Sequence, residues 1–165
     1  MTVRTIRSFG DPVLRDICLP VTRFDEGLVA LVTDLMDTCR LPGRAGLAAP
    51  QIGVIRRVFS FNVDETEGYL INPELIESGG RQDGPEGCLS IGDLFLSTVR
   101  ADRAVAAGVD LENRRVEIEG TGLLARCFQH EIDHLDGHLY IDRLDAENRK
   151  RALKIIRNRQ ISATE

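Results

Sequence analysis

Apolar residues recur at helical spacing in three stretches of the chain. From Asp25 to Arg40, leucines, valines and a methionine stand three and four positions apart behind an aspartate suited to cap a helix, and Pro42-Gly43 ends the pattern. The same spacing predicts a second helix from about Leu123 to Asp136. A third helix is predicted from Ala146 to about Arg159, within residues 146–160.

Four shorter stretches have the β-branched and aromatic character of strands. Arg57 to Val63 comes first, and Tyr69 to Ile71 then runs into a turn. Arg103 to Val109 and Arg115 to Ile118 follow, with Glu112-Asn113 as the hairpin turn between them.

Glycine-rich segments separate these elements. We interpret Gly43 to Gly53 as a connection, and we expect little regular structure in the middle of the chain, where glycines crowd at Gly79, Gly80, Gly84, Gly87 and Gly92. A helix first, strands in the middle and helices last predict an α+β fold. We expect one compact domain over residues 1–165, in which short mixed or antiparallel strands surround the helix that begins near Leu123, with N-terminal and C-terminal helices outside.

Composition narrows the classes of protein. At 165 residues and 42% hydrophobic content, the chain suits one globular domain. It has no apolar run of about 18 residues and no cleavable leader pattern, so we expect no membrane span and a cytoplasmic location. Four dispersed cysteines favour metal binding or catalysis over a disulfide scaffold. A net charge of −5, with both signs mixed, argues against DNA as a partner.

The sharpest local signal is the run His130-Glu131-Ile132-Asp133-His134. Two histidines four positions apart on a helix point the same way, so both rings can bind one ion, and the glutamate between them can act as a general base. Runs of five residues also occur by chance in ordinary helices. The identity of a third ligand therefore decides the class of site.

The helical wheel sets the direction of the neighbouring side chains. At about 100° per residue, Leu123 and Cys127 share one stripe with both histidines, whereas Arg126 and Asp133 belong to an opposite, largely polar face. The histidines are therefore expected to face inward. Glu131 falls in an apolar sector, where burial would raise the pKa of its carboxyl group unless a metal or a donor compensates.

Candidates for the third ligand differ in reach. The longer zinc-peptidase pattern would need a histidine where this chain has Tyr140, and His138 lies about 12 Å along the helix from the first histidine. Cys127 would be a strained ligand about 10 Å from the second histidine, and we interpret it as a wall residue. Cys88 is the better candidate because its flanking glycines let backbone approach a metal, although a lone cysteine is more often a small buried hydrophobe.

Three segments together resemble the peptide deformylase family. They are Gly46-Leu47-Ala48-Ala49-Pro50-Gln51-Ile52-Gly53, Glu86-Gly87-Cys88-Leu89-Ser90 and Gln129-His130-Glu131-Ile132-Asp133-His134-Leu135-Asp136-Gly137. They occur in the family's order and at about its spacing. The likeness extends to Gly10-Asp11-Pro12-Val13-Leu14-Arg15, Asn72-Pro73 and Gly122-Leu123-Leu124-Ala125, so it covers most of the chain except the C-terminal tail.

The resemblance implies a hydrolase that removes the formyl group from the N-terminal methionine of newly made polypeptides, so N-formylmethionyl peptides are its expected partners. It implies one divalent metal ion held by Cys88, His130 and His134. Fe(II) is expected as the native metal, and Zn(II), Ni(II) or Co(II) would fit the same ligands.

Further roles follow from the same resemblance. Glu131 is implied as the acid/base group, and the Gln51 side-chain amide and the Leu89 backbone N–H are implied as donors to the formyl oxygen. Residues implied to bind the peptide, by pairing with its backbone or by lining the methionine pocket, are Gly46, Gly87, Leu123 and Cys127.

Two positions depart from the family's pattern. Arg44 stands where deformylases usually have glycine, and it could crowd the substrate or add a contact to it. Gly92 stands where a proline is often found. Arg126 either lays its aliphatic stem along the pocket or is a solvated surface residue.

Two other functions compete with the hydrolase. A metallopeptidase that cleaves internal bonds would use the same histidine pair, but the downstream ligand is missing and the chain is small. A catalytically silent relative that binds formylated or N-terminal peptides is favoured only by Arg44.

The C-terminal helix carries basic side chains in an acidic protein. On the helical wheel one face holds Ala152, Leu153 and Ile156, and the residues across from it are Lys150, Arg151, Lys154 and Arg157. Because some deformylases are thought to dock on ribosomes through such a helix, the resemblance implies ribosomal RNA phosphate as a partner. A solvated helix face is the alternative.

Overall fold

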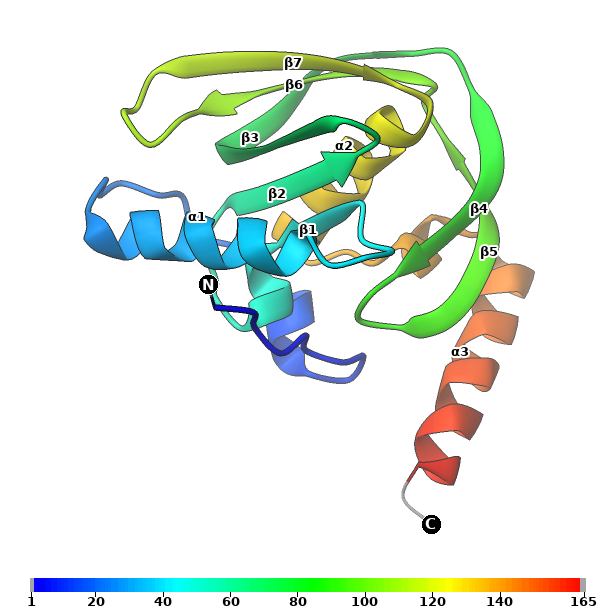
Figure 1. Cartoon of the computed structure of the whole chain (residues 1–165). Helices are drawn as coiled ribbons and strands as arrows, with labels where there is room; N and C mark the ends of the chain where they lie inside the picture. The colour runs from blue at the N-terminus through cyan, green and yellow to red at the C-terminus, as the bar shows by residue number, and fades with distance from the viewer. Residues whose placement is uncertain (1, 164–165) are drawn as a thin grey trace.

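The computed structural model describes residues 2–163 and contains an antiparallel sheet, a long hairpin and helices around them (Figure 1). The helices are α1 (Glu26–Cys39), α2 (Gly122–Leu135) and α3 (Ala146–Ser162), with short 3-10 turns η1 (Pro12–Arg15), η2 (Ala49–Ile52) and η3 (Tyr140–Arg143). The strands are β1 (Gly46–Ala48), β2 (Val58–Val63), β3 (Thr66–Gly79), β4 (Gln82–Cys88), β5 (Gly92–Arg100), β6 (Arg103–Val109) and β7 (Arg115–Thr121).

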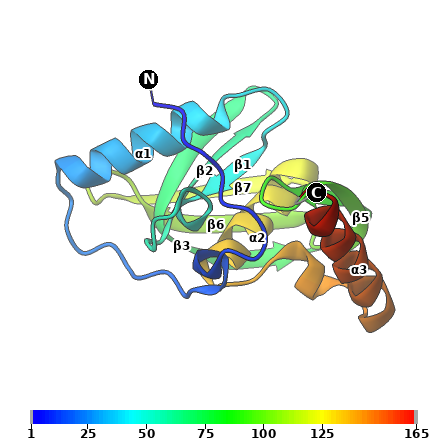
Figure 2. The same ribbon diagram turned by 90° about the horizontal axis from the view of Figure 1, so that it is seen from below.

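Five strands form one sheet in the order β1-β2-β3-β6-β7, and every neighbouring pair is antiparallel. Side chains alternate between the two faces of β2, which sends Phe59 and Phe61 toward α2 and Val58 toward α1. The two helices therefore cover opposite faces of the sheet, as Figures 1 and 2 show. Edge and tilted contacts between Phe59, Phe61 and Phe128 fill the core under α2.

Strands β4 and β5 form a separate two-stranded sheet beside the main one. Our expectation that the glycine-rich middle lacks regular structure is therefore wrong. Glycine weakens a strand but does not forbid it, and the ladder absorbs its irregularity in a register shift between Glu86 and Cys88. This hairpin brings Cys88 toward His130 and His134 of α2.

The other element predictions are largely confirmed. The three predicted helices correspond to α1, α2 and α3, and four predicted strands fall within β2, β3, β6 and β7. Asn113 adopts a left-handed conformation in the β6–β7 turn. The connection over residues 43–53 contains β1 and η2, which the sequence pattern did not separate. The turn predicted after Ile71 is wrong, because β3 continues through a bulge there to Gly79.

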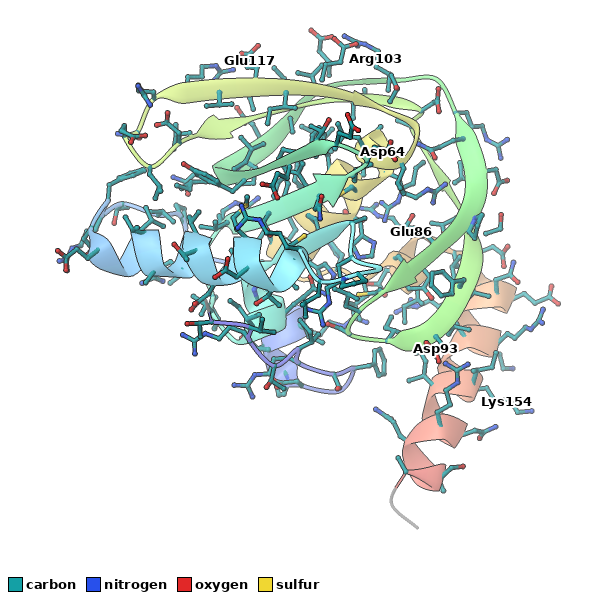
Figure 3. All side chains as sticks on the ribbon, viewed as in Figure 1. Asp64, Glu86, Asp93, Arg103, Glu117 and Lys154 are labelled. Carbon is teal, nitrogen blue, oxygen red and sulfur yellow. The ribbon has the colours of Figure 1, made fainter. Side chains whose placement is uncertain are left out.

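Helix α3 packs by its apolar face. Ala152 and Ile156 are buried against Tyr140 and Ile141, in a cluster that also contains Cys88. The basic side chains of α3 are exposed, and Lys154 lies on the side away from the domain (Figure 3). Among residues 2–163, no helix is long and apolar enough to span a bilayer.

Candidate metal centre and active site

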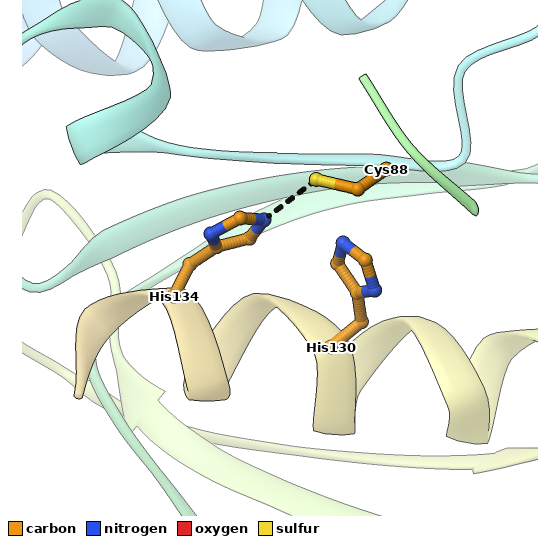
Figure 4. A group of neighbouring side chains, drawn as sticks. All are labelled: Cys88, His130 and His134. Atoms are coloured by element: carbon orange, nitrogen blue, oxygen red, sulfur yellow. Dashed lines mark hydrogen bonds between the residues drawn. The ribbon is translucent and has the colours of Figure 1, made fainter. Parts of the chain in front are cut away.

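Helix α2 and the end of β4 bring three potential metal ligands together. His130 and His134 project from the same side of α2 toward Cys88, and the dashed line in Figure 4 marks the 3.3 Å from Cys88 Sγ to His134 Nε2. One ligand atom from each of the three residues lies within 4.8 Å of the others. A thiolate and two imidazoles suit a divalent transition metal and leave a coordination position open. Buried as they are, these residues fit a metal centre.

Glu86 fixes the orientation of the first histidine. Its Oε1 lies 2.8 Å from His130 Nδ1, which leaves Nε2 of His130 directed at the metal site. The same carboxylate accepts hydrogen bonds from Arg100 (2.7 and 3.0 Å) and from Arg126 Nη1 (2.6 Å). Burial alone would raise the pKa of Glu86, but the hydrogen bonds from His130 and Arg100 outweigh burial and lower it to about 2.

The ion pairs continue from Glu86 to the surface. Arg100 Nη1 donates to Asp133 at 2.7 Å, and Arg143 reaches the same carboxylate through Nη2 at 2.6 Å and Nε at 3.0 Å. Asp133 and Arg126 belong to the polar face that the helical wheel placed opposite the histidines. Both are buried rather than solvated, because the β4–β5 hairpin and η3 supply their partners.

Glu131 is a desolvated carboxyl group. Its side chain is buried, and Oε2 has no hydrogen-bond partner within residues 2–163. Burial raises the pKa of Glu131 to about 7, partly offset by His130, in agreement with the apolar sector predicted for it. A Cβ atom on Gly46 would collide with Glu131, so the glycine lets β1 pass directly over the carboxyl group.

The pKa values of the two histidines are shifted in opposite directions. Burial and the neighbouring His130 hold the pKa of His134 well below its usual range, which favours the neutral ring that binds metals. Burial also lowers the pKa of His130, but hydrogen bonds to Cys88 and Glu86 outweigh burial and raise it. The Glu86 carboxylate beside His130 would also favour a metal cation.

Gln51 is held in a defined rotamer by η2. Its Oε1 accepts the Ala48 N–H at 2.9 Å, and its Nε2 donates to Ser90 Oγ at 3.2 Å and lies 3.7 Å from Cys88 Sγ. The amide N–H groups therefore point toward the metal site. Leu89 follows Cys88 in the turn between β4 and β5 and lines the same pocket.

A cavity of about 350 Å³ opens onto these groups. All four residues implied to bind the peptide line it: Gly46, Gly87, Leu123 and Cys127. Leu123 is 54% exposed, so it lies at the mouth of the cavity and not in its buried interior. Phe95 of β5, which sequence reasoning missed, also lines the mouth and is exposed.

Several alternatives are resolved by contacts. Cys127 Sγ donates to the Ala45 carbonyl, burial raises the pKa of its thiol, and it is not in the ligand cluster. Arg126 is buried and lines the pocket. Arg44 Nη1 donates to the Thr38 carbonyl at the end of α1, and Arg44 is not among the lining residues. Gly92 has φ +82°, a conformation closed to proline.

Glu86 and Arg100 are the functional residues that sequence reasoning missed. Glu86 stands two positions before Cys88 in the same strand, and a carboxylate so near a candidate metal ligand is the signal that would have identified it. Arg100 gave no comparable signal. Its role depends on the pairing of β5 with β4.

Comparisons with known proteins agree with this geometry. The family model described as "Polypeptide deformylase" matches residues 3–150. A peptide deformylase of Acidothermus cellulolyticus is 55% identical over 157 residues, covering 95% of this chain and 87% of the relative. One of a Parafrankia species is 50% identical over 164 residues, covering 98% and 90%. The crystal structure of a peptide deformylase from Legionella pneumophila superposes with a TM-score of 0.89 at 36% identity, covering 99% of each chain.

Proposed function

Because the chain belongs to the peptide deformylase family, we propose that its metal ion is held by Cys88, His130 and His134 and that Glu131 moves the proton during hydrolysis. The enzyme is a metal-dependent hydrolase that removes the N-formyl group from the N-terminal formylmethionine of nascent polypeptides and releases formate. The observation that carries the assignment of residues is the convergence of three ligand atoms within 4.8 Å, beside a buried carboxyl group.

Each side chain has a step that suits its environment. A metal ion bound by Cys88, His130 and His134 would act as a Lewis acid and lower the pKa of the water that attacks the formyl carbon. Glu131 takes the proton of this water at its carboxylate and delivers it to the departing amine nitrogen. The burial that raises the pKa of Glu131 suits a group that must both accept and release a proton.

The negative charge that develops on the formyl oxygen needs donors. We assign this part to the Gln51 amide and the Leu89 backbone N–H, since both border the pocket that contains Cys88. Gly46 of β1 and Gly87 of β4 lie along the pocket and offer backbone for an extended peptide, while Leu123 and Cys127 supply apolar wall to the methionine side chain.

We propose Fe(II) as the native metal, with Zn(II), Ni(II) and Co(II) as substitutes, because a thiolate with two imidazoles accommodates all four. The test is release of formate from a formyl-methionyl peptide, assayed anaerobically after reconstitution with Fe(II) or nickel. Metal analysis should give one ion per chain. An enzyme that binds metal stoichiometrically and releases no formate would contradict the proposed roles.

We further propose that α3 binds ribosomal RNA and that the enzyme works in the cytoplasm, where nascent chains emerge. The support is the division of α3 into a packed apolar face and exposed basic residues, which are Lys150, Arg151, Lys154 and Arg157.

The test of α3 is a reversal of Lys150, Lys154 and Arg157 to Glu. We expect normal hydrolysis of a short formyl peptide but weaker co-sedimentation with ribosomes, and wild-type binding should fall steeply with salt. The matched control reverses Arg23, Arg81 and Arg115, which are exposed and lie outside α3, for the same change in net charge. An equal loss of ribosome co-sedimentation in both triple variants would show that α3 has no specific role in binding.

A further inference from the structure

The N-terminal segment Arg7–Phe9 connects η2, which carries Gln51, to the β4–β5 turn, which carries Leu89. These residues are the two proposed oxyanion donors. The Arg7 N–H donates to the Gln51 carbonyl at 2.7 Å, and the Phe9 N–H donates to the Ser90 carbonyl at 2.8 Å. In Figure 2 the segment, in dark blue, passes η2 and then the β4–β5 turn. One short stretch of backbone thus holds both halves of the site.

These hydrogen bonds close a ring with the site itself. Gln51 and Ser90 are 39 positions apart in sequence, and the Gln51 side chain donates to Ser90 Oγ at 3.2 Å. The ring therefore runs from Arg7 to Gln51, across to Ser90 and back to Phe9. Ser90 directly follows Leu89, so the ring includes the residue beside the second proposed donor.

The segment is itself anchored on both sides. The Arg7 side chain lies against Gly53, which ends η2 with φ +85°, and a Cβ there would come within 3.0 Å of Arg7 Nε. The Phe9 ring packs against the core cluster that includes Ile156 of α3, and Gln160 Nε2 donates to the Phe9 carbonyl at 2.8 Å. The segment is therefore held by η2 on one side and by α3 and its apolar cluster on the other.

We propose that Arg7 and Phe9 are positioning residues whose backbone N–H groups set the separation between the Gln51 amide and the Leu89 N–H. This inference rests on the proposed roles of those two donors. An oxyanion donor contributes about 10²- to 10³-fold in kcat, and only when it is aimed at the developing charge. A displacement of about 1 Å can lower the catalytic rate by about 10²-fold. A segment that holds η2 and the β4–β5 turn at a fixed separation therefore affects kcat directly.

The experiment removes single N–H groups with proline. Arg7→Pro and Phe9→Pro should each lower kcat by about 10-fold or more, with KM and metal content within about twofold of wild type. Arg4→Pro is the matched control, because Arg4 precedes the segment and its N–H donates to Thr38 Oγ1 of α1 rather than to Gln51 or Ser90. It should lower stability while leaving kcat unchanged. Equal losses of kcat in all three variants would overturn the proposal.

A double-mutant cycle separates positioning from general damage. In a Gln51→Ala background, Arg7→Pro should have little further effect on kcat, because it acts through Gln51. Additive losses would overturn the proposal. If the proline variants do not fold, Phe9→phenyllactic acid keeps the ring and replaces the N–H by an ester oxygen, at the cost of a weaker Ser8 carbonyl acceptor for the Asp11 N–H. Wild-type kcat in that ester would also overturn the proposal. Absence of formate release by the wild type would instead reject the proposed function.

Discussion

Replacing Glu86 by glutamine removes one charge from a buried site while keeping its shape. In the wild type, Oε1 faces His130 Nδ1 and Arg100 Nη2, and Oε2 faces Arg100 Nε and Arg126 Nη1. Every neighbour is thus a donor. A glutamine side chain would turn its own NH₂ group toward one of these pairs and leave buried cations without a counter-charge.

The magnitude follows from the pKa of Glu86. A fall from 4.5 to about 2 corresponds to about 3 kcal/mol of preferential stabilisation of the carboxylate in the folded protein. Loss of one partner from a buried ion pair costs about 3–5 kcal/mol in general, which is the same scale. For a domain of this size, about 3 kcal/mol lowers Tm by roughly 6–12 °C. Metal affinity should fall by about 10- to 100-fold, because His130 loses the acceptor that orients its ring.

Two measurements test Glu86→Gln, denaturant unfolding and competition with a metal chelator. Glu119→Gln is the control, since it neutralises an exposed partner of Arg103 and should change stability little. The sign of the pH dependence follows from the lowered pKa: the wild-type contribution is present above about pH 4.5 and is lost as pH falls toward 2. A Glu86→Gln protein with wild-type unfolding midpoint, acid sensitivity and metal affinity would refute the reasoning.

Two further predictions concern the metal centre. Cys88→Ala should abolish stoichiometric metal binding while Cys127→Ala retains it, because only Cys88 lies in the ligand cluster; metal analysis showing the reverse would exchange their roles. Glu131→Gln should keep metal and peptide affinity but lose at least about 10²-fold in turnover, the scale of a general base. Near-normal formate release by that variant would remove Glu131 from the mechanism.

The sequence predicted what depends on local periodicity. Helix α2 and the inward direction of His130 and His134 follow from 3.6-residue spacing, which short-range geometry alone enforces. The desolvation of Glu131 was predicted in the same way, because a residue's sector on a helix is fixed by its position. Periodicity on α2 was unable to identify the third ligand. The glycines beside Cys88 favoured it over Cys127 and His138, and the family resemblance implied the same residue.

The β4–β5 hairpin shows where periodicity fails. Gly84 and Gly87 lower the strand propensity of this stretch, yet pairing with β5 supplies the hydrogen bonds that stabilise it. A Cβ on Gly87 would collide with the ring of Phe95, so the glycine that weakens the strand locally is required by a neighbour in the partner strand. Propensity is a local quantity, whereas this requirement arises only after the strands pair.

The ion-pair network behind His130 is even harder to predict from the sequence than the β4–β5 hairpin. Glu86 and Arg100 are 14 positions apart, and Arg100 and Asp133 are 33 apart, on three different elements. Each charge alone would cost several kcal/mol to bury, so each residue read singly belongs on the surface. The cost is offset only when all partners converge, and convergence is a property of the tertiary structure. Glu86 orients the ring of His130, a proposed metal ligand, although sequence alone would place this charged residue and its partners in solvent.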